Sequence, residues 1–62
     1  MQVTYRDKVW TFDRRLTVIQ MLKLIEFLPE AVLVVRNERI LTEDQHLTPE
    51  DVVRVVSVIS GG

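Results

Sequence analysis

The sequence predicts an α+β domain in which one helix packs on one face of a mixed sheet of four to five strands, in the order β-β-α-β-β-β. Three observations predict it. Apolar and polar residues alternate at the start of the chain, one amphipathic segment follows Thr17, and a valine-rich run fills residues 52–59. With 62 residues, the chain is long enough for one small domain.

Residues 1–12 predict a β-hairpin. Residues 1–6 have the period of a half-buried strand, and Asp7-Lys8 is the expected two-residue turn, although it lacks the glycine that such turns prefer. This register places four large side chains on one face of the hairpin. It pairs Tyr5 with Trp10, and Val3 with Phe12.

Residues 18–28 predict the helix. Thr17 and Gln20 have the spacing of a capping box, in which a hydroxyl and an amide satisfy two free N–H groups at the start of a helix. Pro29 is expected to end the helix. Phe27 lies beside the apolar stripe, and we expect it to pack under a neighbouring loop rather than to form a binding stripe with Ile19. The apolar stripe consists of Val18, Met21, Leu22, Ile25 and Leu28.

The middle of the chain predicts a second hairpin. Residues 31–35 form a continuous apolar run that is typical of a buried strand, and Asn37-Glu38 is the expected turn into a short strand at residues 40–41. Residues 42–51 are polar. In this segment we expect His46 in a solvated loop and Pro49 at the first position of a single helical turn.

Residues 52–59 predict the last strand. Valine occupies five of these eight positions, which favours a strand that is central in its sheet and parallel to the first strand. If Val53 and Val55 face the helix, the alternate residues face away from it. These are Arg54, Val56 and Val58, and we interpret them as a partner-binding surface; the alternative is that a loop or an oligomer contact covers them.

Composition excludes several classes of function. The chain has no Cys and one His, which leaves no disulfide, no thiolate metal site and no metal motif. The net charge of −1 and the absence of a basic stripe argue against nucleic acid as a partner. Neither a signal peptide nor a membrane-length apolar run is present, so we expect a cytoplasmic protein that is a monomer when free. No Ser–His or Cys–His arrangement predicts catalytic residues, so an enzyme is not expected.

The segment Ser60-Gly61-Gly62 follows the last strand directly. We expect a single domain over residues 1–59 and a thin, flexible tail over residues 60–62, because glycine adds no side chain to a core. Such a tail could enter a narrow channel and present the α-carboxylate of Gly62, which is the leading candidate for a reactive group. The alternative is a frayed terminus without a function.

Three stretches resemble the ubiquitin-like β-grasp sulfur carriers of the ThiS (thiamine-thiazole) and MoaD type. They are residues 1–8, residues 34–40, and residues 51–62 with the terminal Gly61-Gly62. The resemblance covers essentially the whole chain, and its last block is the specific one. Where relatives often have a Gly-Asp turn before the final strand, this chain has Pro49-Glu50-Asp51.

The resemblance implies a protein that is a substrate of other enzymes. An E1-like adenylating enzyme (ThiF/MoeB type) would use ATP to adenylate the carboxylate of Gly62, and a sulfur donor enzyme would allow its conversion to a thiocarboxylate. The chain itself would bind no cofactor. Ser60 and Gly61 would thread into the partner, and a sulfur-acceptor enzyme such as thiazole synthase would receive the sulfur.

Other functions of the same tail stay open at this point. The chain could modify proteins as ubiquitin does, through an amide bond between Gly62 and a lysine. It could instead donate sulfur for tRNA thiolation, molybdopterin or cysteine synthesis. A different class is a passive β-grasp interaction module, in which the two terminal glycines are incidental.

Overall fold

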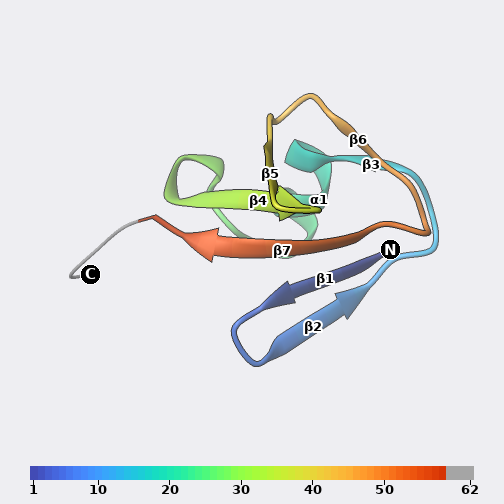
Figure 1. Cartoon of the computed structure of the whole chain (residues 1–62), viewed down its shortest axis with the longest axis horizontal. Coiled ribbons are helices and arrows are strands. Elements are labelled where there is room, and N and C mark those ends of the chain that lie inside the picture. The colour runs from blue at the N-terminus through green and yellow to red at the C-terminus, as the bar shows by residue number, and fades with distance from the viewer. Residues whose placement is uncertain (59–62) are drawn as a thin grey trace.

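The computed structural model describes residues 1–58, and Figure 1 shows a mixed five-stranded sheet with one helix packed against it. A further sheet of two very short strands, β3 and β6, lies beside the main one. The elements in chain order are β1 (Gln2–Tyr5), β2 (Lys8–Thr11), β3 (Leu16–Thr17), α1 (Val18–Leu24), the 3₁₀ helix η1 (Pro29–Ala31), β4 (Val32–Arg36), β5 (Arg39–Leu41), β6 (His46–Leu47) and β7 (Val52–Ser57).

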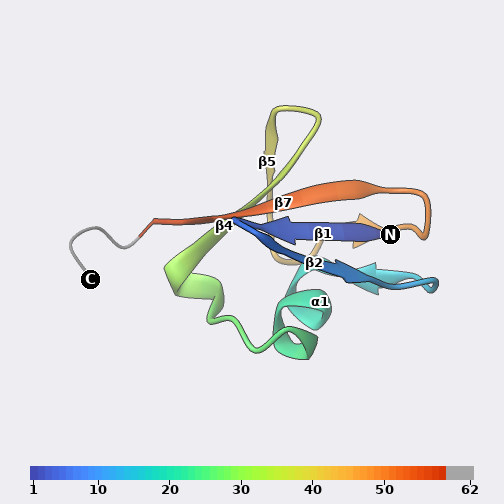
Figure 2. The same ribbon diagram turned by 90° about the horizontal axis from the view of Figure 1, so that it is seen from below.

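Strand β7 occupies the centre of the main sheet, in the order β2-β1-β7-β4-β5. It runs parallel to β1 and antiparallel to β4, so both of its edges are hydrogen-bonded. Figure 2 shows the sheet nearly edge-on, with α1 on one side of it. The α+β class, the central last strand and its parallel pairing with the first strand are therefore confirmed.

The first hairpin forms, but its predicted register is wrong. The turn lies at Arg6-Asp7 rather than at Asp7-Lys8, so Tyr5 pairs with Lys8 and Val3 pairs with Trp10. The reason is that Arg6 adopts a positive φ of 54°, a conformation that the sequence pattern gave no reason to expect from arginine. The pairing partner of each residue is therefore shifted by two positions along the other strand. Because side chains alternate between faces, a shift of two leaves the large side chains on one face, against the core.

Helix α1 begins where the capping box predicts. The Thr17 hydroxyl accepts a hydrogen bond from Gln20 N at 3.2 Å, and Gln20 Oε1 accepts one from Thr17 N at 2.9 Å. The predicted end at Leu28 is wrong, because the last helical residue is Leu24. Beyond it Glu26 takes a φ of 63°, and Phe27 N donates to Leu22 O at 2.9 Å. This is the Schellman arrangement that closes a helix, so Pro29 is not what ends it.

The segment after α1 rearranges the predicted stripe. Leu28, which we expected in the core, is 64% exposed. Phe27 instead packs against the first hairpin, with its ring centroid 4.8 Å from that of Tyr5 and 5.8 Å from that of Trp10, both edge to face. Phe27 therefore packs inside the molecule, but against the strands of the β1–β2 hairpin and not under the loop that we expected. Ile19 is half-buried.

The second hairpin matches its prediction closely. Arg36 pairs with Arg39 around the two-residue turn Asn37-Glu38, whose residues both have positive φ, at 52° and 66°. These angles are typical of the type I′ turn, whose twist suits a tight hairpin. Strand β4 is not buried along its whole length, because Leu33 is 37% exposed while Val32 and Val34 are buried.

Residues 42–51 contain more regular structure than their polar composition indicates. His46 is exposed, as expected, but it lies in β6 and pairs with Thr17 of β3 rather than in a loop. In place of the expected helical turn, residues 48–51 form a β-turn, in which Asp51 N donates to Thr48 O at 3.1 Å. The adjacent β3–β6 pair holds this segment over the helix side of the core.

The core lies between α1 and the inner face of the main sheet. Met21 and Leu22 of the helix are buried against Val3 of β1 and the inward residues of β4 and β7. No side chain in it is polar or charged. The buried residues are Met1, Val3, Leu16, Val18, Met21, Leu22, Ile25, Val32, Val34, Leu41, Leu47, Val53 and Val55.

Candidate functional site

The last described residue of the chain is held against the sheet. Val58 N donates to Ala31 O at 3.0 Å, which extends the pairing between β7 and the start of β4. The chain therefore leaves the domain from a strand with bonded neighbours. Residues 59–62 lie outside the described part of the structure, so the expectations for Ser60, Gly61 and Gly62 stay predictions.

The side-chain alternation along β7 is as predicted. Val53 and Val55 are buried under α1, whereas Val56 is 37% exposed and Val58 is 47% exposed. Arg54 is also exposed. The three predicted surface residues therefore lie together on the sheet face opposite α1, next to the point where the chain leaves the domain. Whether a partner binds this face is not tested by the fold.

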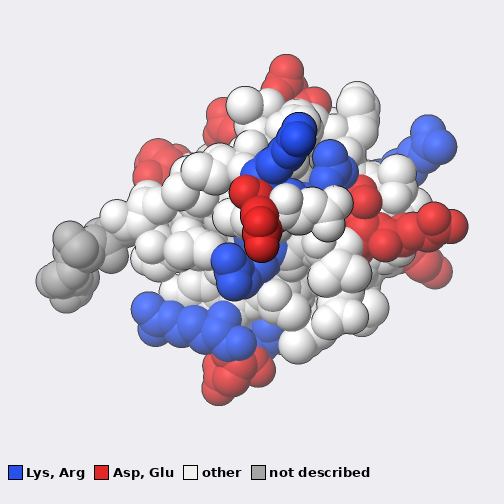
Figure 3. All heavy atoms as spheres, in the orientation of Figure 1, with Lys and Arg blue, Asp and Glu red and all other residues white. Residues whose placement is uncertain are grey.

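Two further apolar residues join this face by strand pairing. Leu33 of β4 lies directly opposite Val56, and Ile40 of β5 lies opposite Val35, which is paired with Arg54 in turn. We name Leu33, Ile40, Arg54, Val56 and Val58 the outer patch. Ile40 is 62% exposed, and in the view of Figure 3 uncharged side chains surround the end of β7. Leu33, Val56 and Val58 are exposed apolar side chains on one face, and such a group on a small protein is typical of an interaction site.

Sequence reasoning missed Leu33 and Ile40. The continuous run of apolar residues in 31–35 hid which of them face outward, because a run without alternation gives no parity. The signal that could have found them was the Asn37-Glu38 turn, which fixes the register of the hairpin. Once Arg36 is paired with Arg39, Ile40 and the outward residues of β4 must share a face.

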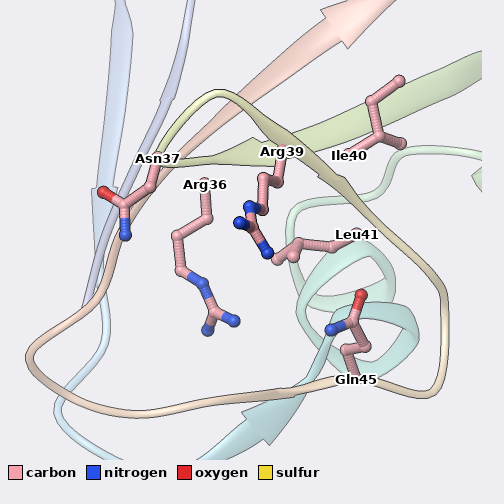
Figure 4. Close-up of a pocket in the computed structure, with 6 residues that line it drawn as sticks. All are labelled: Arg36, Asn37, Arg39, Ile40, Leu41 and Gln45. Atoms are coloured by element: carbon pink, nitrogen blue, oxygen red, sulfur yellow. The ribbon is translucent and has the colours of Figure 1, made fainter.

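A second surface feature is the hollow between β5 and the segment that carries Gln45 (Figure 4). Arg36 and Arg39 extend into it from adjacent strands. Of these two arginines, Arg36 is paired with a carboxylate: its Nη1 lies 3.0 Å from Asp51 Oδ2 in a half-buried ion pair. Arg36 and Arg39 are the charged residues of the lining, and Asp51 balances the charge of Arg36.

Asp51 anchors the start of β7. Its carboxylate accepts a hydrogen bond from Thr48 N at 2.9 Å as well as the one from Arg36. The bond from the Thr48 backbone, and then the Arg36 guanidinium, lower the pKa of Asp51 from its ordinary value. The carboxylate thus ties the turn before β7 to the end of β4, which fixes where the outer patch begins.

Within residues 1–58 no three His, Asp or Glu side chains are grouped as a metal site would need. No helix in this part of the chain is long and apolar enough to cross a membrane. What the described part supplies is a fixed surface at the root of the C-terminal segment.

One helix packed on a five-stranded mixed sheet, with the last strand in the centre, defines a ubiquitin-like β-grasp protein. The model of the ThiS family matches residues 2–62, and the chain belongs to this family. The protein is thus a sulfur carrier in general terms, since ThiS proteins are small carriers rather than catalysts and work with E1-like activating enzymes and sulfur acceptors. No curated protein matches the chain.

Proposed function

We propose that the α-carboxylate of Gly62 is the group that carries sulfur, and that the sulfur goes to thiazole formation in thiamine biosynthesis. The observation that supports this most is the segment that follows β7. This strand is central in the sheet, and Ser60-Gly61-Gly62 come only a few residues after it. The family match extends through these residues. The absence of cysteine from the sequence leaves no side-chain thiol to hold a persulfide.

The chemistry needs an activated carboxylate. An oxygen of the Gly62 carboxylate attacks the α-phosphorus of ATP, which forms an acyl-adenylate and releases pyrophosphate. A hydrosulfide equivalent from the sulfur donor then attacks the carbonyl carbon. The C–S bond forms, the C–O bond to AMP breaks, and the thiocarboxylate loses its proton to solvent. ATP is consumed in the activating partner, and the carrier supplies only the terminus.

The tail has the length and width that this reaction requires. Four extended residues from Ile59 to Gly62 span about 13–14 Å, which lets the carboxylate reach a shielded pocket while the domain stays outside. A Cβ at Gly61 or Gly62 would widen the chain and restrict φ. Ser60 and Gly61 are therefore proposed as the threading residues.

The outer patch is proposed as the surface that docks on the activating enzyme. Val58 lies at the root of the tail, and Val56 and Leu33 form the apolar centre of the patch. Arg54 adds a charge that could orient the partner. Because β7 is bonded on both sides, docking on this patch would fix the direction in which the tail enters the partner.

The test is a reconstitution with the full chain, its E1-like partner, ATP and sulfide. We expect an intact mass that rises by the difference between sulfur and oxygen, with the change located on Gly62 by fragmentation. Deletion of Gly62, or Gly61→Val, should abolish the product while the fold, measured by circular dichroism, stays unchanged. Failure of the complete system to produce the heavier form would overturn the proposal.

The acceptor is tested separately with the isolated thiocarboxylate form. Thiazole synthase should use it to form the thiazole, whereas the carboxylate form should be inactive. If a tRNA-thiolating, molybdopterin-forming or cysteine-forming enzyme uses it instead, the thiazole assignment is wrong and the carrier assignment stands. Reductant-resistant conjugates of higher mass on denaturing gels would indicate protein modification through Gly62.

A further inference from the structure

A groove on the helix side of the molecule has a composition that differs from the rest of the surface. It lies between the loop before β3 and the exposed side of α1 and has a volume of about 390 Å³. Its lining is Arg14, Arg15, Leu16, Gln20, Lys23 and Leu24. Three of the eight Lys and Arg residues of the chain therefore line one groove, in a protein whose net charge is −1.

Among residues 1–58, none of these three side chains takes part in an ion pair. Among residues 1–58 the ion pair that meets normal distance limits joins Arg36 and Asp51, which are not part of the groove. The nearest acidic residues are Asp13, next to Arg14 in sequence, and Glu43, whose backbone oxygen accepts a hydrogen bond from Ile19 N beside Gln20; neither is part of the lining. The spacing of Gln20, Lys23 and Leu24 places their side chains on one side of α1, facing the loop. The lining of the groove therefore carries three positive side chains and no negative one.

The groove also has an apolar component. Leu16 is buried and belongs to the core, whereas Leu24 is 48% exposed although it lies in the last turn of the helix. An exposed leucine beside three cations favours an occupant that carries acidic groups together with an apolar side chain. A small inorganic anion would use the charges and leave Leu24 in water.

The position of the groove is separate from that of the outer patch. Leu16 and α1 lie on the inner face of the main sheet, whereas Val56 and Leu33 point from the opposite face. Figure 2 shows α1 on that inner side of the sheet. A partner on the outer patch would therefore leave the groove open.

We propose that this groove binds an acidic, leucine-containing segment of a partner protein, and that it can do so while the outer patch is occupied. The carboxylates of the segment pair with Arg14, Arg15 and Lys23, and its apolar side chain covers Leu24. The inference concerns a second contact surface and does not depend on the chemistry of Gly62. A carrier that must pass between two proteins gains from having two faces, since the second partner can bind before the first leaves.

The test uses a synthetic peptide in which glutamates flank a leucine, titrated into the ¹⁵N-labelled full chain. We expect amide shifts at the residues that line the groove, and binding that weakens as salt is added. The double variant R14E/R15E should bind the peptide roughly tenfold more weakly or worse, because two attractions become repulsions. A dispersed amide spectrum of the variant would confirm that it is folded.

The control variant R6E/K8E makes the same change of net charge in the β1–β2 hairpin and should leave peptide binding nearly unchanged. Equal weakening by both variants would show that net charge alone attracts the peptide, and the groove would not be a site. A peptide with lysine in place of glutamate should not bind. If inorganic phosphate at the same concentration produces the same shifts, the groove is a small-anion site and the proposal of a protein segment is overturned.

Simultaneous occupation has its own measurement. The chain bound to its E1-like activating partner should bind the acidic peptide with an affinity within about threefold of that of the free chain. Loss of peptide binding in that complex would show that the groove and the activating partner compete, which would overturn the second half of the proposal. The titration of the free chain is unaffected by the outcome of sulfur transfer, so the two proposals fail separately.

Discussion

Glu26 has a backbone conformation that is unfavourable for any residue with a Cβ atom. It has a φ of 63° at the position after the helix cap, where glycine is the usual residue. Because a Cβ makes this region unfavourable, Glu26→Gly should raise the free energy of unfolding by about 1 kcal/mol, after allowance for the greater freedom of glycine in the unfolded chain. Urea unfolding followed by the fluorescence of Trp10, the single tryptophan of the chain, would measure it.

Glu50→Gly is the matched control for this prediction. Glu50 is also exposed and lies in a turn, but it does not have a positive φ. The same substitution should there lower stability by about 0.5 kcal/mol, because only the entropic cost of glycine remains. Stabilisation by both variants, or by neither, would contradict the explanation from backbone strain.

Asp51 makes part of the stability dependent on pH. Its pKa in the folded protein lies below the ordinary value of 3.8, through Thr48 N and then Arg36. The stabilisation is therefore complete above the pKa of the unfolded chain and is lost as the pH falls through the lower folded value. Asp51→Asn should reduce the free energy of unfolding by about 1 kcal/mol at pH 6, and the difference from the original chain should shrink below pH 4.

Denaturant unfolding at a series of pH values between about 6 and 3 would measure this dependence. Asp7→Asn is a suitable control, because Asp7 is exposed in the β1–β2 turn and takes part in no described ion pair. A constant difference between Asp51→Asn and the original chain across the series would show that the carboxylate charge does not stabilise the fold.

At the scale of elements, the start of α1 depends on two side chains. Thr17 and Gln20 each satisfy a backbone N–H of the other. Thr17→Ala should lower the free energy of unfolding by about 1 kcal/mol, whereas Thr17→Ser keeps the hydroxyl and should cost less. Thermal unfolding by circular dichroism would compare them. An equal loss in both variants would point to the γ-methyl group of Thr17, which both lack, rather than to the cap.

The ends of the elements were less predictable than their presence. The alternation in residues 1–6 and the capping pair predicted the hairpin and the helix correctly. The turn at Arg6 and the helix end at Glu26 were missed for the same reason, since a positive φ at a charged residue has no local sequence signal. The turn at Asn37-Glu38 was predicted, and its first residue is asparagine, which tolerates a positive φ better than arginine or glutamate does.

The short β3–β6 pair shows another limit of local reasoning. Each strand has two residues, and the pair forms because Leu16 and Leu47 are buried on the same side of the core. Residues 42–51 are polar around that one leucine, which predicts a loop. Only the packing of segments far apart in the sequence reveals the pairing, because a two-residue strand has no period of its own.

At the scale of the whole molecule, the outer patch makes a testable docking surface. Val56→Asp places a charge at its apolar centre and should weaken binding to the E1-like activating partner by about tenfold, because a docked carboxylate would lose its water. Isothermal titration with the purified partner would measure it. The fold should persist, since Val56 is 37% exposed.

Val9→Asp is the control for the docking surface. Val9 is 60% exposed on the edge strand β2; it shares the outer face with Arg54, but β1 and β7 separate its strand from β4, which carries Leu33. It should leave partner binding almost unchanged. Strong loss with Val9→Asp and none with Val56→Asp would place the interface at the β1–β2 side of the sheet instead.

The candidate site was predictable to the extent that it lies on one strand. Parity along residues 52–58 placed Arg54, Val56 and Val58 on one face, because alternation is a property of the strand itself. The positions of Leu33 and Ile40 on this face depend on strand pairing, and the positive groove forms where the loop before β3 lies next to α1. Arg14-Arg15 alone was an ordinary charged pair in the sequence, since Lys23 lies eight positions away and joins it only in the fold.

The central position of β7 also has a mechanical consequence. A force applied to the C-terminal end of β7 acts along the strand, parallel to β1 and antiparallel to β4. The hydrogen bonds on both edges lie across that direction, so they are loaded together in shear and do not open one after another. An unfolding enzyme that pulls the protein from its C-terminal end therefore has to break the hydrogen bonds on both edges of β7 together. A pull on β5 at the sheet edge would instead break the bonds to β4 one after another.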